Sequence, residues 1–269
     1  MISKIITRKT LSENLYKLEI KPSGTFITPK PGQYIILRVL PDGAAITLPV
    51  VKTDSSRETL TVFASSIPET LTALVNPCLS GIQIEMEGPF GQPFHIEKFG
   101  AVLCVVNQES MISIYPVLAA LRAAGNLITC LLTGTSGDDQ ILENEIRNLS
   151  DYFINTERNP RRTSQVLEQT LRVQKYDQVF AIGSAKTIRE TLTVCTATGT
   201  EAQSMLCLNE KTQKGLHGIY RVSICGNTRA LCVDGYNFNA YYTSFEEMVK
   251  RFGCKHSESH VLNRVDTPV

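Results

Sequence analysis

The sequence lacks several features that would point to particular classes of function. Its 27 Lys and Arg residues nearly balance its 26 Asp and Glu residues, so no excess of positive charge favours binding to nucleic acid. No apolar run approaches the ~20 residues that a membrane-spanning helix needs. The first ten residues, MISKIITRKT, become polar too early for a signal peptide, whose apolar core has roughly 7–15 residues. We therefore expect a cytoplasmic protein that binds neither nucleic acid nor membranes.

Cysteine is present, but no two of the 8 cysteines form a Cys-x-x-Cys pair. The close ligand spacing of common structural zinc and iron–sulfur motifs is therefore missing. In a reducing compartment, cysteines are expected to be thiols or metal ligands rather than disulfides. Cys104 and Cys130 lie within apolar runs, where a cysteine is usually a small core residue.

A glycine-rich turn is missing from the segment where it would matter most. Residues 101–106 form an unbroken apolar run typical of a buried parallel strand, and the apolar spacing of residues 114–121 predicts a helix that ends at Gly125. In a strand–turn–helix unit that binds nucleotides, glycines let the phosphates approach the helix N-terminus. The turn here is Asn107-Gln-Glu-Ser110, which has side chains and the Glu109 carboxylate in that place. The sequence predicts a nucleotide-domain scaffold with a filled phosphate site.

The N-terminal third of the chain has the pattern of a small antiparallel β-barrel. Short alternating segments are separated by turns rich in Gly and Pro. The predicted strands span residues 15–20, 34–39, 59–63 and 82–86, and a short helix or crossover is predicted at 70–79. We assign the barrel to residues 1–98.

The middle of the chain alternates between strands and helices, which predicts a doubly wound parallel sheet over residues 99–200. Besides the strand at 101–106, predicted strands span 126–132, 152–155 and 176–182, and predicted helices span 141–149, 163–173 and 185–195. Residues 201–256 are expected to form a small third unit. It contains a hairpin of strands 220–225 and 229–233, with a turn at 226–227, and a helix at 244–252. Residues 257–269 form a polar tail.

Short motifs along the chain resemble the ferredoxin–NADP reductase superfamily. They are Pro31-Gly-Gln-Tyr34, Gly88-Pro-Phe-Gly-Gln-Pro-Phe94, Ile114-Tyr-Pro116, Ala123-Ala-Gly125, Ile141-Leu-Glu143, Ala181-Ile-Gly183, and Cys232-Val-Asp-Gly235 followed by Phe238. Their order is similar to that in the electron-transfer subunit of dihydroorotate dehydrogenase B and in the small subunit of NADH-dependent ferredoxin:NADP oxidoreductase. The resemblance implies a β-barrel followed by an α/β nucleotide-type domain and a small iron–sulfur-type domain.

The resemblance also implies FAD on the barrel. In the family, the flavin lies against an Arg-x-Pro-x-Ser/Thr strand whose arginine neutralises the diphosphate. Ala45, Thr47 and Pro49 stand at those three positions here, so a strong charge-assisted contact is lost. The FAD-binding candidates are Thr47, Leu48, Pro49, Thr70, Gly88, Pro89, Phe90 and Gly91. Two interpretations remain open: a rewired flavin site, or turns that only close the barrel hairpins.

The family's other two cofactor motifs are altered as well. Its Gly-Gly-Gly-x-Gly turn corresponds to residues 106–110, so we expect no NAD(P)H binding in the family's manner. Two of its [2Fe–2S] cysteines correspond to His217 and Tyr220, while Cys232 is unchanged, so no conventional cluster is expected. The residues that could instead hold zinc are Cys207, His217, Cys225 and Cys232. Packed thiols and a buried histidine are the simpler interpretation.

Three functions are consistent with these patterns. The first is an accessory electron-transfer subunit that has lost NAD(P)H and cluster binding, could retain FAD and docks on a larger flavin or iron–sulfur subunit. The second is an active FAD-dependent NAD(P)H oxidoreductase with remodelled sites. The third is a metal-binding or regulatory module built on the region of Cys207, His217 and Cys232. No pattern identifies a catalytic residue.

Overall fold

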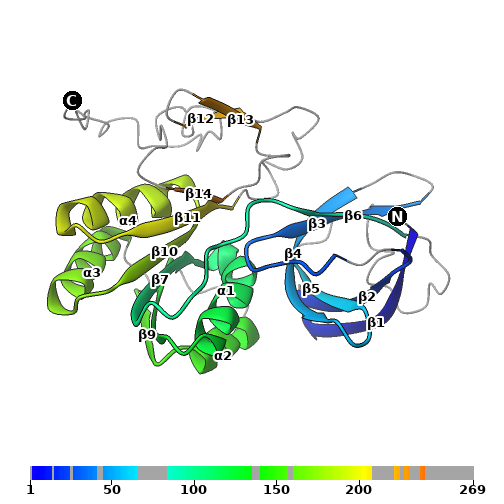
Figure 1. Ribbon diagram of the computed structural model, residues 1–269. Coiled ribbons are helices and arrows are strands. Elements are labelled where there is room, and N and C mark those ends of the chain that lie inside the picture. The colour runs from blue at the N-terminus through cyan, green and yellow to red at the C-terminus, as the bar shows by residue number, and fades with distance from the viewer. Residues whose placement is uncertain are drawn as a thin grey trace.

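The structure is a computed structural model. It describes residues 2–13, 15–24, 27–40, 45–65, 84–134, 140–156, 160–207, 221–224, 227–230 and 237–239. Figure 1 shows a β-barrel beside an α/β sheet, connected by an extended segment that follows β6. No helix in the described part of the chain is long and apolar enough to cross a membrane.

The barrel has six strands, all paired antiparallel, in the order β1-β2-β5-β4-β3-β6. The strands are β1 (Ile2–Ser12), β2 (Leu15–Pro22), β3 (Tyr34–Val39), β4 (Ala45–Asp54), β5 (Thr59–Ser65) and β6 (Ile84–Phe90). The predicted barrel is confirmed. The sequence patterns did not reveal β1, because only Ser3 of its eleven residues is buried and the expected alternation is absent. The crossover predicted at residues 70–79 lies outside the described residues.

Strand β4 carries two kinds of contact on its two faces. Leu48 and Val50 point into the barrel core, and Val51 belongs to the cluster shared with the α/β domain. This change of side follows a register shift in the β4–β5 pairing between Val50 and Lys52. The outward residues Thr47 and Pro49 are half-buried.

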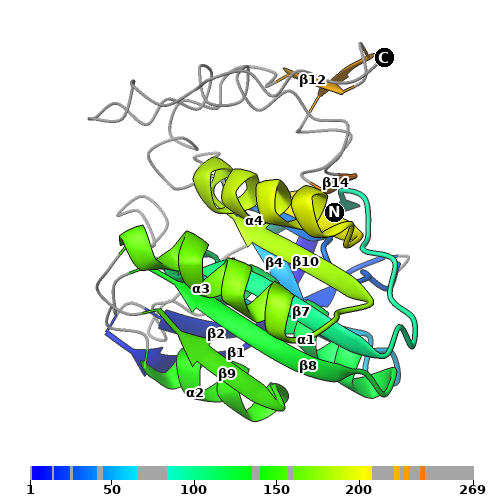
Figure 2. The ribbon, with the colours of Figure 1, turned by 90° about the vertical axis from the view of Figure 1, so that its left-hand side faces the viewer.

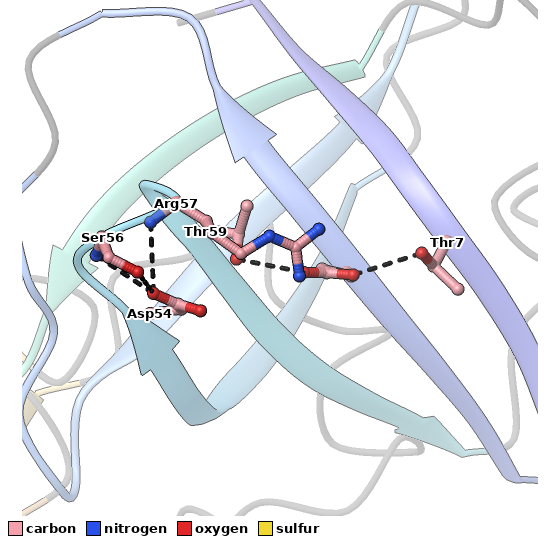
Figure 3. Close-up of polar contacts among 6 residues, drawn as sticks. Thr7, Asp54, Ser56, Arg57 and Thr59 are labelled. Atoms are coloured by element: carbon pink, nitrogen blue, oxygen red, sulfur yellow. Dashed lines mark hydrogen bonds and ion pairs between the residues drawn. The ribbon is translucent and has the colours of Figure 1, made fainter.

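Polar contacts hold the β4–β5 turn against β2, as Figure 3 shows. Asp54 Oδ1 accepts hydrogen bonds from Ser56 Oγ at 2.6 Å and from the Ser56 and Arg57 amides at 3.0 and 3.1 Å. These hydrogen bonds lower the pKa of Asp54. Glu19 accepts from Thr7 and Thr59 and pairs with Arg57 at 3.1 Å. This network stabilises the β4–β5 hairpin and its packing on β2.

The α/β domain is built on a six-stranded sheet in the order β14-β11-β10-β7-β8-β9. Its strands are β7 (Ala101–Asn107), β8 (Leu127–Thr133), β9 (Tyr152–Asn155), β10 (Gln178–Gly183), β11 (Ala202–Leu206) and β14 (Asn237–Asn239), of which only β14 pairs antiparallel. Its helices are α1 (Met111–Ala123), α2 (Gln140–Leu149), α3 (Pro160–Val173) and α4 (Ala185–Thr198). Apolar residues of α1 and α2 pack on one face, and those of α3 and α4 on the other. Figure 2 shows both layers of helices, which confirms the predicted doubly wound sheet.

The parallel sheet extends past residue 200, where the sequence analysis placed its limit. Strand β11 continues the sheet beside β10, and β14 adds a further edge strand. The predicted hairpin is present as β12 (Arg221–Ile224) and β13 (Asn227–Ala230). Asn227 pairs with Ile224, so it belongs to the strand rather than to the turn. The predicted helix at 244–252 and the tail at 257–269 lie outside the described residues.

The barrel and the sheet share one hydrophobic cluster. Leu15, Val51 and Phe63 of the barrel belong to it together with Ile114 and Leu118 of α1. The Phe63 ring meets the Tyr115 ring edge-on at 5.8 Å. The two domains therefore pack through an apolar interface and not through the connecting segment alone.

Two carboxamide side chains tie down the segment between the domains. Gln203 of β11 accepts from the His95 amide and donates to the His95 carbonyl, both at 3.0 Å. Asn126 accepts from the Phe99 and Gly100 amides and donates to the carbonyls of Glu97 and Leu121, at 2.8–3.1 Å. These four bonds use both acceptor positions and both donor hydrogens of the Asn126 carboxamide. Because Asn126 is buried, water could not take the place of a lost partner.

Phe94 anchors the same segment to both domains. Its amide donates to the Pro31 carbonyl at 2.9 Å, and its ring meets the Phe180 ring edge-on at 5.6 Å. The ring also packs against the backbone of Gly32, where a Cβ would lie 2.7 Å from Phe94 Cδ2. Glycine is required there both by this contact and by its φ of +90°.

Candidate functional site

The sheet has a topological switch point between β7 and β10. The chain continues from β7 to β8 on one side of this pair and from β10 to β11 on the other. Doubly wound sheets bind ligands in the crevice outside the carboxyl ends of their strands at such a point. Asn107 ends β7 and Gly183 ends β10, so these two residues lie at the base of the expected crevice.

The Asn107 side chain fills this position. A Cβ on Gly183 would collide with Asn107 Oδ1 and would lie 3.2 Å from Asn107 Cγ. Asn107 Oδ1 is buried and, within the described residues, has no hydrogen-bond partner. An unpaired buried acceptor costs about 1–3 kcal/mol. The switch point is therefore occupied by a protein side chain at a cost in stability.

The turn after β7 also differs from an open phosphate loop. Residues 108–110 form the 3-10 helix η2 (Gln108–Ser110), and the Met111 amide donates to the Gln108 carbonyl. Ser110 is buried, and its hydroxyl does not cap α1. Glu109, which the sequence analysis singled out, is exposed. The sequence analysis placed Asn107 in the turn, whereas the structure places it at the end of β7, and its contact with Gly183 left no signal in the sequence.

Cys207 lies above the same edge of the sheet. Its amide donates to the Gly183 carbonyl at 2.8 Å. Desolvation raises the pKa of its thiol, and hydrogen bonds with Ser113 and Ser110 oppose that rise. The thiol is therefore protonated at neutral pH. The other zinc candidates, His217, Cys225 and Cys232, lie outside the described residues. Among the described residues, the hydrogen-bond partners of the Cys207 thiol are Ser113 and Ser110.

The outer face of the barrel contains the described candidates for the flavin site. Cross-strand pairs arrange its residues in rows: Tyr34 opposite Pro49, Ile36 opposite Thr47, and Arg38 opposite Ala45. Thr47 is half-buried, and its hydroxyl makes no hydrogen bond to another described residue. Leu48 is 4% exposed and packs inside the barrel, so only its backbone can face a ligand on this surface.

Two glycines lie at one end of this face, Gly88 within β6 and Gly91 directly after it. Gly88 and Gly91 have φ values of +125° and +90°, which favour glycine. Gln33 Nε2 donates to the Gly91 carbonyl at 2.9 Å, and the Tyr34 and Phe90 rings lie 5.9 Å apart. Pro89 and Phe90 are half-buried residues of β6, while Thr70 lies outside the described residues.

Comparisons with known proteins agree with this architecture. No family model matches the chain. The chain is 25% identical over 258 residues to the dihydroorotate dehydrogenase B (NAD(+)) electron transfer subunit homolog of Thermotoga maritima, covering 93% of this chain and 90% of the relative.

Solved structures share the fold. The NADH-dependent reduced ferredoxin–NADP oxidoreductase, whose structure addresses flavin-based electron bifurcation, has a chain that matches with a TM-score of 0.73 and 23% identity, over 93% of this chain and 92% of that one. Phthalate dioxygenase reductase, a modular structure for electron transfer from pyridine nucleotides to [2Fe–2S], matches with a TM-score of 0.53 and 17% identity, over 78% and 70%. The barrel, the sheet, their order and these matches confirm that the chain has the fold of the ferredoxin–NADP reductase superfamily, as its motifs indicated.

Proposed function

We propose that this chain is an electron-transfer subunit of a multi-subunit redox complex. It would bind FAD on the outer face of its barrel, would not bind NAD(P)H at its sheet, and would dock on a larger flavin or iron–sulfur subunit. The name of the Thermotoga maritima relative, an electron transfer subunit homolog, supports this role. The match of both domains to the ferredoxin–NADP oxidoreductase chain supports the scaffold.

The observation that carries the proposal is the contact between Asn107 and Gly183. A dinucleotide needs open space and backbone amides at the carboxyl ends of β7 and β10. The Asn107 side chain is in that space, and its buried oxygen is an acceptor that would repel a phosphate oxygen. The residues at the switch point therefore do not fit a nicotinamide dinucleotide.

The barrel face does fit a flavin. A bound flavin supplies a centre that accepts and releases electrons. Thr47 offers a hydroxyl without a hydrogen-bond partner among the described residues, and the segment Gly88–Gly91 at the end of β6 brings backbone close to the same surface. The half-buried Phe90 ring, which packs on the buried Tyr34 ring, would cover the end of the ligand that lies beside it.

The cysteines support a reducing, cytoplasmic compartment for this subunit. Within the described residues, Cys104, Cys130, Cys195 and Cys207 are all free. Cys104 and Cys130 are paired in register on β7 and β8 and are fully buried, as core thiols usually are.

The test combines flavin binding with nucleotide reduction. The purified chain, stripped of flavin and titrated with FAD, is expected to quench flavin fluorescence at one equivalent. The loaded protein should then keep its oxidised flavin absorption under anaerobic NADH or NADPH, while dithionite bleaches it. Bleaching by either nucleotide would favour the active oxidoreductase instead. A chain that binds no flavin would overturn the proposed flavin site.

A further inference from the structure

We propose that Arg38 of β3 binds the FAD diphosphate, in place of the arginine that is missing from β4. This inference rests on the proposed flavin site and assigns a residue that sequence motifs do not reveal. The cation would have moved by one strand while remaining on the same face of the barrel.

Strand register places Arg38 next to the missing arginine. Arg38 pairs directly with Ala45 across the β3–β4 ladder. Directly opposed residues of an antiparallel pair point to the same face, with Cβ atoms about 4.5–5.5 Å apart. Leu37 and Val39, the neighbours of Arg38, are buried in the barrel core, so Arg38 points outward. Ala45 is exposed and leaves space above it for the longer side chain of Arg38.

The rows of this face follow the order of chemical groups in FAD. The Tyr34–Pro49 row lies beside the end of β6, where the half-buried Pro49 and Phe90 offer apolar surface for a ring system and Tyr34 is buried beneath it. The Ile36–Thr47 row adds a hydroxyl, which suits a polyol chain. The Arg38–Ala45 row adds a cation, about 13 Å from the first row at a rise of ~3.3 Å per residue. A ligand with a flat ring at one end and a diphosphate beyond a polyol would match all three rows.

The ion pair between Arg38 and Glu87 is weak enough to yield to a diphosphate. Its Nη2 atom lies 3.7 Å from Glu87 Oε1, beyond ordinary hydrogen-bond distance, and the two side chains are 37% and 42% exposed. Such a surface pair contributes about 0–1 kcal/mol. Glu85 lies opposite Arg38 on β6 and is a second carboxylate beside it. Both carboxylates would orient the guanidinium before binding and compete with the phosphate.

The test is a binding comparison of three flavins, each titrated into flavin-free protein and followed by flavin fluorescence. FAD and FMN carry phosphate, whereas riboflavin does not. Arg38→Gln is expected to weaken FAD binding by about 10- to 100-fold, the range for lost hydrogen bonds to a charged group, and to leave riboflavin binding within twofold. Glu87→Gln should tighten FAD binding severalfold because it removes a competing carboxylate. FMN, with one phosphate, should lose less affinity than FAD.

Two further variants make the result specific. Lys52→Gln removes one positive charge from an exposed site on β4 and should leave all three affinities unchanged. Ala45→Arg, added to Arg38→Gln, should restore FAD binding, since it places the guanidinium one strand away on the same face. Thermal unfolding of each variant checks that the barrel is intact.

The outcomes separate this inference from the proposed function. Wild-type protein that binds FAD with the same affinity as the Arg38→Gln variant would overturn the role of Arg38 and leave the flavin site standing. Equal wild-type affinities for riboflavin and FAD would also overturn it. Wild-type protein that binds none of the three flavins would overturn the flavin site itself.

Discussion

A double-mutant cycle between Gly183 and Asn107 tests whether the switch point is filled. In the wild-type background, Gly183→Ala puts a methyl group against Asn107 Oδ1 and 3.2 Å from Asn107 Cγ. Overpacking of this kind costs typically 1–3 kcal/mol, so we expect a loss of about 2 kcal/mol. Asn107→Ala removes both atoms and the unpaired buried acceptor, so it should stabilise the protein by about 1 kcal/mol.

In the Asn107→Ala background, Thr187 Cβ, at an ordinary 3.4 Å, is the one that remains of the three atoms nearest to the methyl group on Gly183. Gly183→Ala should therefore cost there only what its φ of +158° costs, which is the same in both backgrounds, and the coupling energy should be about 2 kcal/mol. Urea unfolding followed by far-UV circular dichroism suits the measurement, because the sequence has no Trp. Effects that add to within about 0.5 kcal/mol would refute the contact and, with it, the filled switch point.

Three further predictions concern the connection between the domains and the thiol at the sheet edge. Gly32→Ala should destabilise the protein by about 3 kcal/mol in urea unfolding, because its Cβ would lie 2.7 Å from the Phe94 ring. The control is Gly125→Ala, which has a similar φ of +81° but nothing within 4 Å of its Cβ, and it should cost only about 1 kcal/mol. Asn126→Ala should cost about 2 kcal/mol, because it leaves the Gly100 amide without a hydrogen-bond partner and leaves the Phe99 amide and the Glu97 carbonyl only their 3.2 Å hydrogen bond to each other; equal stability of the two proteins would contradict the tie. Alkylation of Cys207 by iodoacetamide, measured by peptide mass spectrometry, should be slow at pH 7 and rise only above pH 9, since burial raises the thiol pKa above its usual value of 9.0. Ser113→Ala should shift this pH profile to still higher pH, because it removes a hydrogen bond that lowers the thiol pKa. Fast labelling of Cys207 at pH 7 would contradict the raised pKa.

The sequence predicted the elements of the fold better than their limits. The apolar runs at 101–106 and 126–132 became β7 and β8, because buried parallel strands need continuous apolar residues. Strand β11 was missed because Ala202–Leu206 is short and contains two polar residues, and its place depends on pairing with β10. Strand β1 was missed for the opposite reason, because most of its side chains lie at the surface.

The candidate sites depended on contacts that a sequence does not show. The missing glycines predicted an altered turn, but the packing of Asn107 on Gly183 joins residues 76 positions apart and needs the sheet register. Similarly, Ala45 revealed the loss of an arginine, whereas the position of Arg38 opposite Ala45 follows only from the β3–β4 pairing. His217, Cys225 and Cys232 remain predictions, since they lie outside the described residues.

The ties on the segment between the domains have a consequence for how a partner could act on this chain. Gln203 fixes His95, Asn126 fixes residues 97–100, and Phe94 contacts both Gly32 and Phe180. The barrel and the sheet therefore reorient together and not about a hinge. In the proposed complex, a subunit that binds either domain would also set the orientation of the other, so a single docking contact would be enough to align the outer face of the barrel with a redox centre of that subunit.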